Sequence, residues 1–204
     1  TGTTAGADMA AVSVHKSGGS LTQSSILLCG PSVNPHYVRQ IINLTQTTSA
    51  SYLLLSSLDI SRRNLALHGE EHVEKVKRFS QYAREEINKL GDYYAYSREL
   101  CNGDSIYDFD VTKLSVNTRA LGLAGIEVYD ILRDDYGIQV EFGDLSNILA
   151  YISLGDKNKD LERLISALGD IRRLHKRPLN AAPRSEYISP EVVLSPQAAF
   201  YGEK

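Results

Sequence analysis

Residues 13–24 read SVHKSGGSLTQS, and this stretch decides the fold assignment of the chain. Residues 9–14, which overlap the start of this stretch, are small and β-branched. They predict a strand that ends at the residues next to Lys16. The glycine pair Gly18-Gly19 then breaks regular structure. The sequence therefore predicts a lysine at the end of a buried strand, beside hydroxyl groups, an imidazole and two glycines.

A lysine in this setting has two interpretations. Beside apolar walls an ammonium group loses its proton more readily and can attack a carbonyl to give a Schiff base. Hydroxyls, an imidazole and the backbone N–H groups beside glycines suit a phosphate. The alternative is a surface lysine that follows a strand and precedes a polar turn, because most lysines in proteins are exposed.

The composition excludes several classes of protein. Of the 204 residues 42% are hydrophobic and 23% are charged, which is typical of a globular chain and unlike a disordered one. The net charge of −3 gives no reason to expect nucleic acid or an anionic membrane as a partner. The longest apolar run, residues 52–55, is too short to cross a bilayer. Since no signal peptide begins the chain, and Cys29 and Cys101 make no disulfide framework, we expect a cytoplasmic protein.

The first half of the chain predicts one further strand and two helical regions. Residues 24–28 indicate a short buried strand, and Asn34-Pro35 is typical of a helix start, where asparagine caps and proline loses no needed N–H. Residues 51–90 have helical spacing of apolar positions, closed by a Gly-Asp pair. Because Gly69 interrupts this pattern, a division into two successive helices is left open.

After Gly91 the pattern predicts a small α+β layer of three strands covered by helices on one face. The expected strands and helices are, in chain order, residues 113–118, a helix over 126–132, residues 138–142, residues 148–154 and a helix over 161–175. Residues 178–196 hold four of the six prolines and predict a linker or an extended arm.

Residues 13–16 (SVHK), followed by LTQ at 21–23, resemble the pyridoxal-phosphate lysine motif of the ornithine/lysine/arginine decarboxylase family, in the fold-type-I (aspartate-aminotransferase-like) group. The ending, residues 178–196, is similar to the biosynthetic branch that includes Gram-positive arginine and lysine decarboxylases. The resemblance covers nearly the whole chain in the family's order. Further similar blocks are QTTSASYLL (46–54), SLD (57–59), RR (62–63), GIQVE (137–141), NIL (147–149) and LGD (154–156).

The resemblance implies an α/β fold class: the tail of a fold-type-I large domain followed by a small α+β domain. Residues 1–91 are then the C-terminal part of the pyridoxal-phosphate-binding domain, residues 92–177 the small domain, and residues 178–204 a Pro-rich linker. In the family, the aspartate on the pyridine nitrogen and the stacking residue lie well upstream of the lysine. We therefore expect a piece of a longer enzyme that is inactive alone.

By the same resemblance, Lys16 is the lysine that binds pyridoxal 5'-phosphate, and Ser13 and His15 help to hold the cofactor phosphate. His15 could also assist proton transfer, since imidazole titrates near neutral pH. Thr47 and Thr48 would reach the phosphate bound by a partner subunit. The alternative for these two threonines is a helix N-cap.

A basic substrate side chain needs a carboxylate partner. Glu141 and Asp144, between two predicted strands of the small domain, are candidates, with a solvated surface turn as the alternative. His68 and His72 are four residues apart and could bind a metal, but Glu70, Glu71 and Glu74 around them indicate an exposed charged face, so we expect no metal.

The implied function is decarboxylation of a basic amino acid, arginine before lysine before ornithine, to the corresponding polyamine-pathway amine. The expected partners are this small-molecule substrate and a second copy of the chain, in a homodimer or larger homo-oligomer formed through the large domain. One alternative is another fold-type-I enzyme, an aminotransferase or an aldolase. The other is a non-catalytic segment for assembly or regulation.

Overall fold

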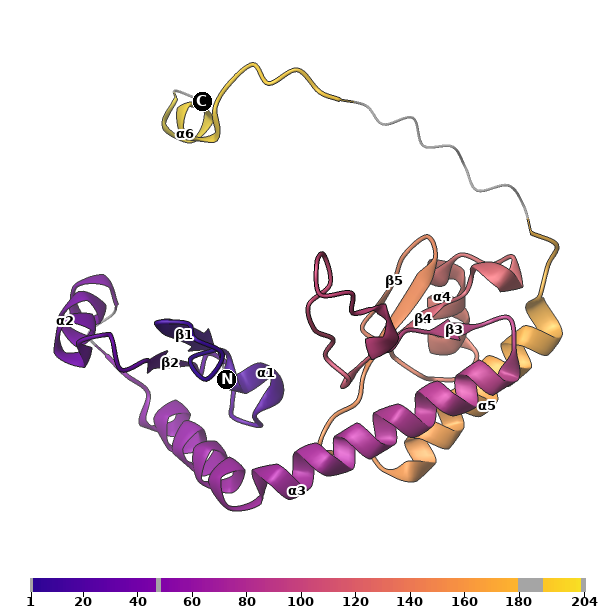
Figure 1. Cartoon of the computed structure of the whole chain (residues 1–204), viewed down its shortest axis with the longest axis horizontal. Coiled ribbons are helices and arrows are strands. Elements are labelled where there is room, and N and C mark those ends of the chain that lie inside the picture. The colour runs from indigo at the N-terminus through magenta and orange to yellow at the C-terminus, as the bar shows by residue number, and fades with distance from the viewer. Residues whose placement is uncertain (1, 47–48, 180–188, 203–204) are drawn as a thin grey trace.

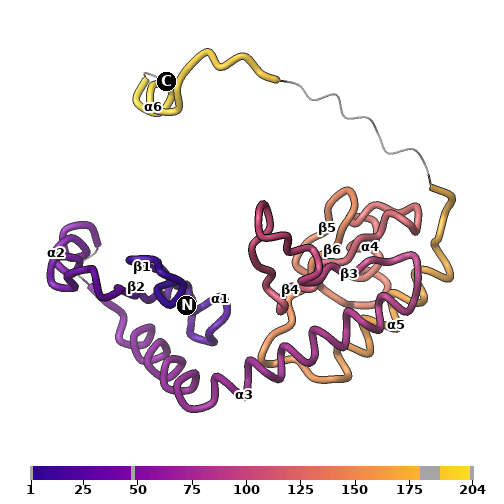
Figure 2. The backbone as a smooth tube through the Cα atoms, in the orientation of Figure 1, coloured from indigo at the N-terminus to yellow at the C-terminus, as the bar shows by residue number. Residues whose placement is uncertain are grey.

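The computed structural model describes residues 2–46, 49–179 and 189–202. A long helix, α3 (Tyr52–Leu90), joins a small N-terminal region to a sheet with two further helices (Figures 1 and 2). The N-terminal region contains β1 (Met9–Val12), α1 (Val14–Ser17), β2 (Ile26–Cys29) and α2 (Pro35–Thr45). The candidate site lies between this region and the sheet.

Strands β1 and β2 form an antiparallel pair in which Met9 lies opposite Cys29 and Val12 opposite Ile26. The predicted first strand ends earlier than expected, so Lys16 lies on the helical turn α1 and not at a strand end. The prediction of a buried second strand is also wrong, because the residues of β2 alternate between half-buried and exposed. Within the described residues these two strands form their own sheet, and such a ribbon leaves much of its surface open.

Both predicted helical regions are present. The Asn34 side chain accepts a 3.0 Å hydrogen bond from the His36 N–H, with Pro35 in the first helical position. Helix α3 runs without interruption through Gly69, although it changes direction within its N-terminal half (Figure 1). A single interior glycine costs a helix only about 1 kcal/mol, so neighbouring good helix formers can continue it.

The second sheet has four antiparallel strands in the order β3-β4-β6-β5. The strands are β3 (Tyr94–Ala95), β4 (Lys113–Asn117), β5 (Phe142–Gly143) and β6 (Asn147–Tyr151). The predictions of β4 and β6 are confirmed in place. The predicted strand over residues 138–142 is wrong, because only its last residue enters the sheet, and β3 is too short to give a periodic pattern.

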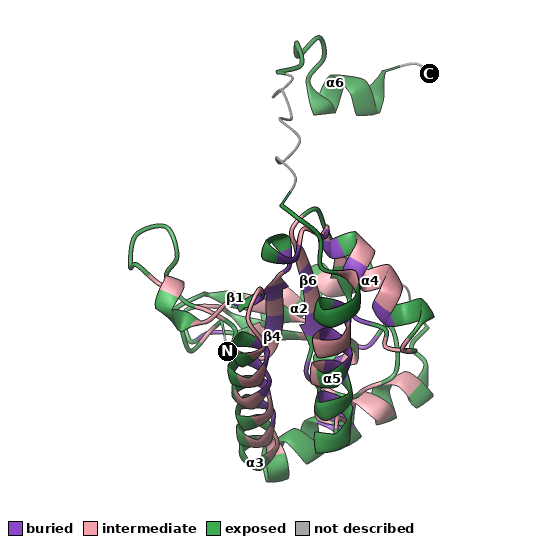
Figure 3. Cartoon of the chain, turned by 90° about the vertical axis from the view of Figure 1, so that its right-hand side faces the viewer, coloured by how far each residue is buried: buried purple, intermediate pink, exposed green. Residues whose placement is uncertain are grey.

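Helices α4 (Gly125–Asp134) and α5 (Asn158–His175), with the second half of α3, form one hydrophobic core with the sheet. Figure 3 shows the buried residues concentrated on β4, β6 and the facing helices. The first residue of this core along the chain is Val76. Apolar packing therefore joins the second half of α3 to the sheet and to helices α4 and α5. The domain division at residue 91 therefore remains a prediction.

The remaining elements are short. They are the 3-10 turns η1 (Arg98–Leu100) and η2 (Arg119–Leu121) and the helix α6 (Pro196–Tyr201), which has no buried residue. Helix α6 lies inside residues 178–204, which the sequence predicted as a Pro-rich linker without a helix. No helix in the described ranges is long and apolar enough to span a bilayer.

Candidate functional site

Lys16 lies on a one-turn helix that two glycines close. The Gly18 N–H donates a 2.6 Å hydrogen bond to the Val14 carbonyl, and a Cβ at Gly18 would lie 2.5 Å from Cγ1 of Val14. Gly19 has a φ of +88°, in the left-handed region that favours glycine. The Gly18-Gly19 pair that the sequence analysis singled out therefore makes a tight exit from the lysine turn.

Helix α3 holds this turn in place. The hydroxyl of Ser61, which is buried, donates a hydrogen bond to the Gly18 carbonyl. The Leu21 N–H donates to the hydroxyl of Ser57, at 3.2 Å. Two serines one helical turn apart thus attach the segment that carries Lys16 to the first half of α3.

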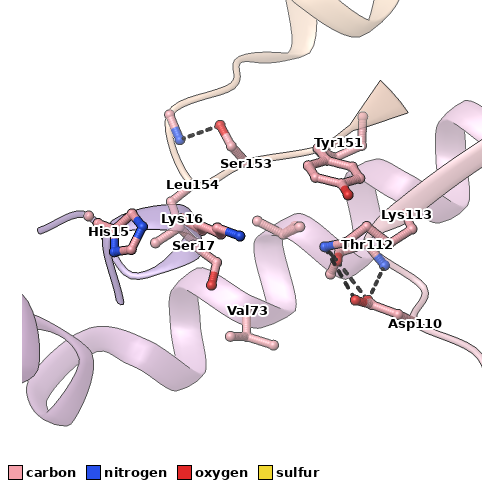
Figure 4. A pocket seen from close by; sticks show the side chains of 14 residues that line it. His15, Lys16, Ser17, Val73, Asp110, Thr112, Lys113, Tyr151, Ser153 and Leu154 are labelled. Atoms are coloured by element: carbon pink, nitrogen blue, oxygen red, sulfur yellow. Dashed lines mark hydrogen bonds and ion pairs between the residues drawn. The ribbon is translucent and has the colours of Figure 1, made fainter. Parts of the chain in front are cut away.

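A cavity of about 590 Å³ separates the lysine turn from the sheet. In Figure 4 the Lys16 side chain extends into this space, with Val73 of α3 below it and Leu154 above. The opposite wall consists of residues that precede or belong to β4 and of Tyr151 at the end of β6. The lining residues are His15, Lys16, Ser17, Gly19, Val73, Val76, Asp110, Thr112, Lys113, Tyr151, Ile152, Ser153, Leu154 and Gly155.

The second half of α3 holds two segments around the cavity, one after β6 and one before β4, through side-chain hydrogen bonds to backbone carbonyls. Lys75 Nζ donates to the carbonyl oxygens of Leu154, at 3.3 Å, and Asp156, at 2.9 Å. Arg84 Nη2 donates to the carbonyl oxygens of Val111, at 2.7 Å, and Lys113, at 2.8 Å. One helix therefore supports the lysine turn and the facing wall, which sets the width of the cavity.

His15 lies beside Lys16, on the side away from Asp110 (Figure 4). Its Nδ1 is 2.9 Å from the carbonyl oxygen of Ser24, and its backbone N–H donates to the same oxygen at 3.3 Å. A proton on Nδ1 satisfies this contact and leaves Nε2 for another partner. The hydroxyl of Ser13, at the N-cap of α1, makes no capping bond.

The structure does not bring all the predicted site residues together. His15 and Lys16 line the cavity, whereas Ser13, Glu141 and Asp144 are not among its lining residues. Asp144 instead organises the β5–β6 turn, because its Oδ1 accepts the backbone N–H of Ser146, at 2.6 Å, and that of Asn147. The cavity therefore gives no support for substrate contacts of Glu141 and Asp144, which stay a prediction. Thr47 and Thr48 lie outside the described residues.

Sequence reasoning missed the residues of the facing wall. Asp110, Thr112 and Lys113 precede or start a strand that was read only as half-buried sheet. An Asp-x-Thr spacing signals a local turn, but nothing in it indicates that the turn faces a lysine almost 100 positions earlier. That proximity arises from the packing of both segments on α3.

The site thus consists of a lysine on a Gly-Gly turn that faces a small sheet across a cavity, and the family of the chain can be identified. Residues 4–114 match the family profile described as Orn/Lys/Arg decarboxylase, major domain. The chain belongs to the Orn/Lys/Arg decarboxylase family.

Its curated relatives include arginine decarboxylases. The chain is 42% identical over 203 residues to the arginine decarboxylase of Halalkalibacterium halodurans. The aligned region covers 98% of this chain and 41% of that protein. It is 41% identical to the arginine decarboxylase of Bacillus cereus, covering 98% of the chain and 44% of the relative. The chain thus spans about two fifths of the length of these relatives.

Two solved structures share its fold. The lysine decarboxylase LdcF of Francisella novicida superposes with a TM-score of 0.69 at 19% identity, over 81% of this chain and 28% of that one. The constitutive lysine decarboxylase of E. coli gives a TM-score of 0.66 at 16% identity, with the same coverage. The expected fold, the tail of a decarboxylase fold of this class, is confirmed.

The family is generally dependent on pyridoxal 5'-phosphate, and the residues around Lys16 fit such an anionic aldehyde. The Lys16 amine reaches the cavity, which Lys113 also lines with a positive charge. The hydroxyls of Ser20 and Ser24, close to Lys16 in sequence, are buried in the described structure without a hydrogen-bond partner. Buried hydroxyls without partners are costly. Neither serine lines the cavity, so the fit to the cofactor rests on the side chains of Lys16 and His15.

Proposed function

We propose that the intact protein is a cytoplasmic enzyme that decarboxylates a basic amino acid, arginine before lysine, with pyridoxal 5'-phosphate. The observation that carries this proposal is the position of Lys16, whose amine extends into a cavity between the two halves of the chain. The similarity to arginine decarboxylases supports the substrate class.

In this proposal Lys16 supplies the amine that binds the cofactor aldehyde, and His15, which also lines the cavity, binds the phosphate. Ser13 does not line the cavity, so the proposal includes no contact between Ser13 and the phosphate. When bound, the cofactor would supply the electron sink for the electrons released as the carboxylate leaves. The contact between His15 Nδ1 and the Ser24 carbonyl fixes the imidazole, so a protonated Nε2 can donate to a phosphate oxygen.

The apolar side of the cavity has a separate role. Val73, Val76 and Leu154 line the space beside Lys16, and Val76 is buried in the core. Apolar walls reduce the water around the reacting groups and strengthen the charge interactions there.

Borohydride reduction of the intact protein in the presence of pyridoxal 5'-phosphate tests the proposal. We expect one labelled peptide, containing Lys16, and release of carbon dioxide from arginine. Lys16→Ala should lose the label and the release, whereas Lys77→Ala, which removes an exposed lysine on α3, should retain both. A label on another lysine would refute the assigned role of Lys16. Keto-acid formation without carbon dioxide would favour an aminotransferase.

We further propose that the intact protein forms a homodimer or larger homo-oligomer through its N-terminal region. Large apolar side chains are exposed on α2 and on the first half of α3, including Leu44 (81% exposed), Tyr52 (85%) and Leu53 (70%). Exposed apolar surface of this kind marks an interface. Light scattering of Leu44→Glu should show a smaller species than the unmodified protein; an unchanged mass would exclude this face.

A further inference from the structure

Asp110 lies on the cavity wall that faces Lys16 (Figure 4). Its carboxylate is oriented by Thr112: Oδ1 accepts hydrogen bonds from the Thr112 N–H, at 2.9 Å, and from the Thr112 hydroxyl, at 2.7 Å. One carboxylate oxygen is thus occupied by the local turn. The two hydrogen bonds to Oδ1 orient the carboxylate group and so fix where the second oxygen, Oδ2, lies.

The Oδ2 atom retains capacity for a cation. Its ion pair with Lys113 Nζ is 3.3 Å long, compared with about 2.7–2.9 Å for a strong charge-assisted hydrogen bond. The side chain of Asp110 is 56% exposed, so a molecule in the cavity can reach it. Lys113 also makes a cation–π contact, because its Nζ lies 4.4 Å from the centre of the Tyr151 ring.

The backbone that carries Asp110 is held firmly. Arg84 donates to the carbonyl oxygens on both sides of Thr112, and the hydroxyl of Ser80 also donates to that of Val111. Arg84 and Ser80 are both buried. A carboxylate on a segment fixed in this way loses little conformational entropy when it binds a ligand.

The ionised state of Asp110 is favoured near neutral pH. Burial raises the pKa of this carboxyl, but the hydrogen bonds from Thr112 and the charge of Lys113 outweigh it, so that the pKa lies below its usual value. The group is therefore an anion under the conditions in which arginine and lysine carry a distal positive charge.

We propose that Asp110 binds the distal cation of the substrate, the guanidinium of arginine or the ammonium of lysine, and so selects basic amino acids. This inference rests on the proposed function. With the reacting end of the substrate held near Lys16, the distal group extends toward the opposite wall. The incoming cation replaces Lys113 as the ionic partner of Oδ2, so the carboxylate still has a positive partner. Lys113 keeps its own contact with the Tyr151 ring.

The test compares arginine with citrulline, its neutral isostere, as substrates of the intact holoenzyme. Asp110→Asn retains the shape of the side chain and an oxygen for Thr112 but removes the charge. We expect kcat/KM for arginine to fall about tenfold, mainly through KM, with less than about threefold change for citrulline, because a hydrogen bond to a charged group is lost for arginine alone. Asp110→Glu, which restores the charge, should recover part of the preference.

Asp108→Asn is the matched control, since Asp108 lies on the same loop, pairs with Arg98 at 2.8 Å and does not line the cavity. It should leave the preference for arginine unchanged. An Asp110→Asn enzyme that loses activity equally on both substrates, or keeps its preference, would overturn the inference while the proposed function stands. If the unmodified holoenzyme releases no carbon dioxide from arginine or lysine, the proposed function fails, and this inference fails with it.

Discussion

Arg84 Nη2 donates a 2.8 Å hydrogen bond to the carbonyl oxygen of Lys113, which joins the C-terminal part of α3 to the first residue of β4. The same guanidinium reaches the carbonyl oxygens of Val111, at 2.7 Å, and Tyr96, at 2.8 Å. Burial lowers the pKa of Arg84, and the nearby charge of Asp110 opposes that effect. A single buried cation thus satisfies carbonyl oxygens at both ends of the connection between β3 and β4.

Replacement of Arg84 by methionine should destabilise the protein strongly. The variant removes four hydrogen bonds. Val111 keeps the Ser80 hydroxyl, but the carbonyl oxygens of Tyr96 and Lys113 lose their Arg84 donor, each at a cost of about 1–3 kcal/mol. We expect a loss of roughly 3 kcal/mol or more in the free energy of unfolding, measured by urea denaturation. Arg78→Met, an exposed position on the same helix, should stay within about 0.5 kcal/mol of the unmodified protein. Equal stabilities of the two variants would contradict this account.

Lys75→Met should loosen the other part of the cavity wall. The variant loses the two Nζ hydrogen bonds to the carbonyl oxygens of Leu154 and Asp156 but keeps most of the apolar stem. We expect faster amide hydrogen exchange over residues 153–157, with little change in β4. Lys77→Met, which loses only an exposed pair with Glu74, serves as the control and should leave that exchange unchanged. Faster exchange in both variants would argue against a specific role for Lys75.

The core of the sheet region gives a packing prediction. Leu168 of α5 is fully buried, whereas Leu174 on the same helix is 59% exposed. Leu168→Ala should lower the free energy of unfolding by about 2–5 kcal/mol, because it removes buried methyl groups and leaves a cavity. Leu174→Ala should cost less than about 1 kcal/mol. Thermal denaturation of the two variants measures the difference, and a larger loss for Leu174→Ala would mean that α5 packs with another face.

Asp92 predicts a contribution to stability that depends on pH. Its carboxylate accepts from Lys176 at 2.7 Å and from Arg172 at 2.8 Å, and these hydrogen bonds hold its pKa below the usual value of 3.8. A carboxyl with a lowered pKa in the folded state stabilises the protein above its unfolded pKa and loses that effect as the pH falls through the folded value.

Asp92→Asn should therefore be less stable than the unmodified protein at neutral pH and equally stable in strong acid. Asparagine tolerates the positive φ of 59° at this position, so the backbone conformation need not change. Urea denaturation between about pH 2 and pH 7 follows the difference, which should be largest above the pKa of a free carboxyl. A difference that persisted unchanged at the acid end would show that the effect is not due to charge.

Local patterns in the sequence were sufficient for the long elements. The apolar spacing of α3 and α5, the Asn34-Pro35 start of α2 and the alternation in β4 predicted elements that the structure contains. These signals are local, since each depends on which face of one helix or strand is apolar. The short strands β3 and β5 gave no such signal, because two residues cannot show a period and their pairing depends on neighbouring strands.

The sequence by itself determined which lysine stands out, because SVHK followed by two glycines places an amine beside a forced turn. It could not determine what faces that amine. Ser61, Lys75 and Arg84 lie along one helix, and their hydrogen bonds attach three segments of the chain that are far apart in sequence. These bonds reach the carbonyl oxygens of Gly18, Leu154 and Val111. The cavity and the position of Asp110 in its wall therefore arise only when the chain is folded, because long-range contacts along α3, and not local patterns, set the distance between the two walls.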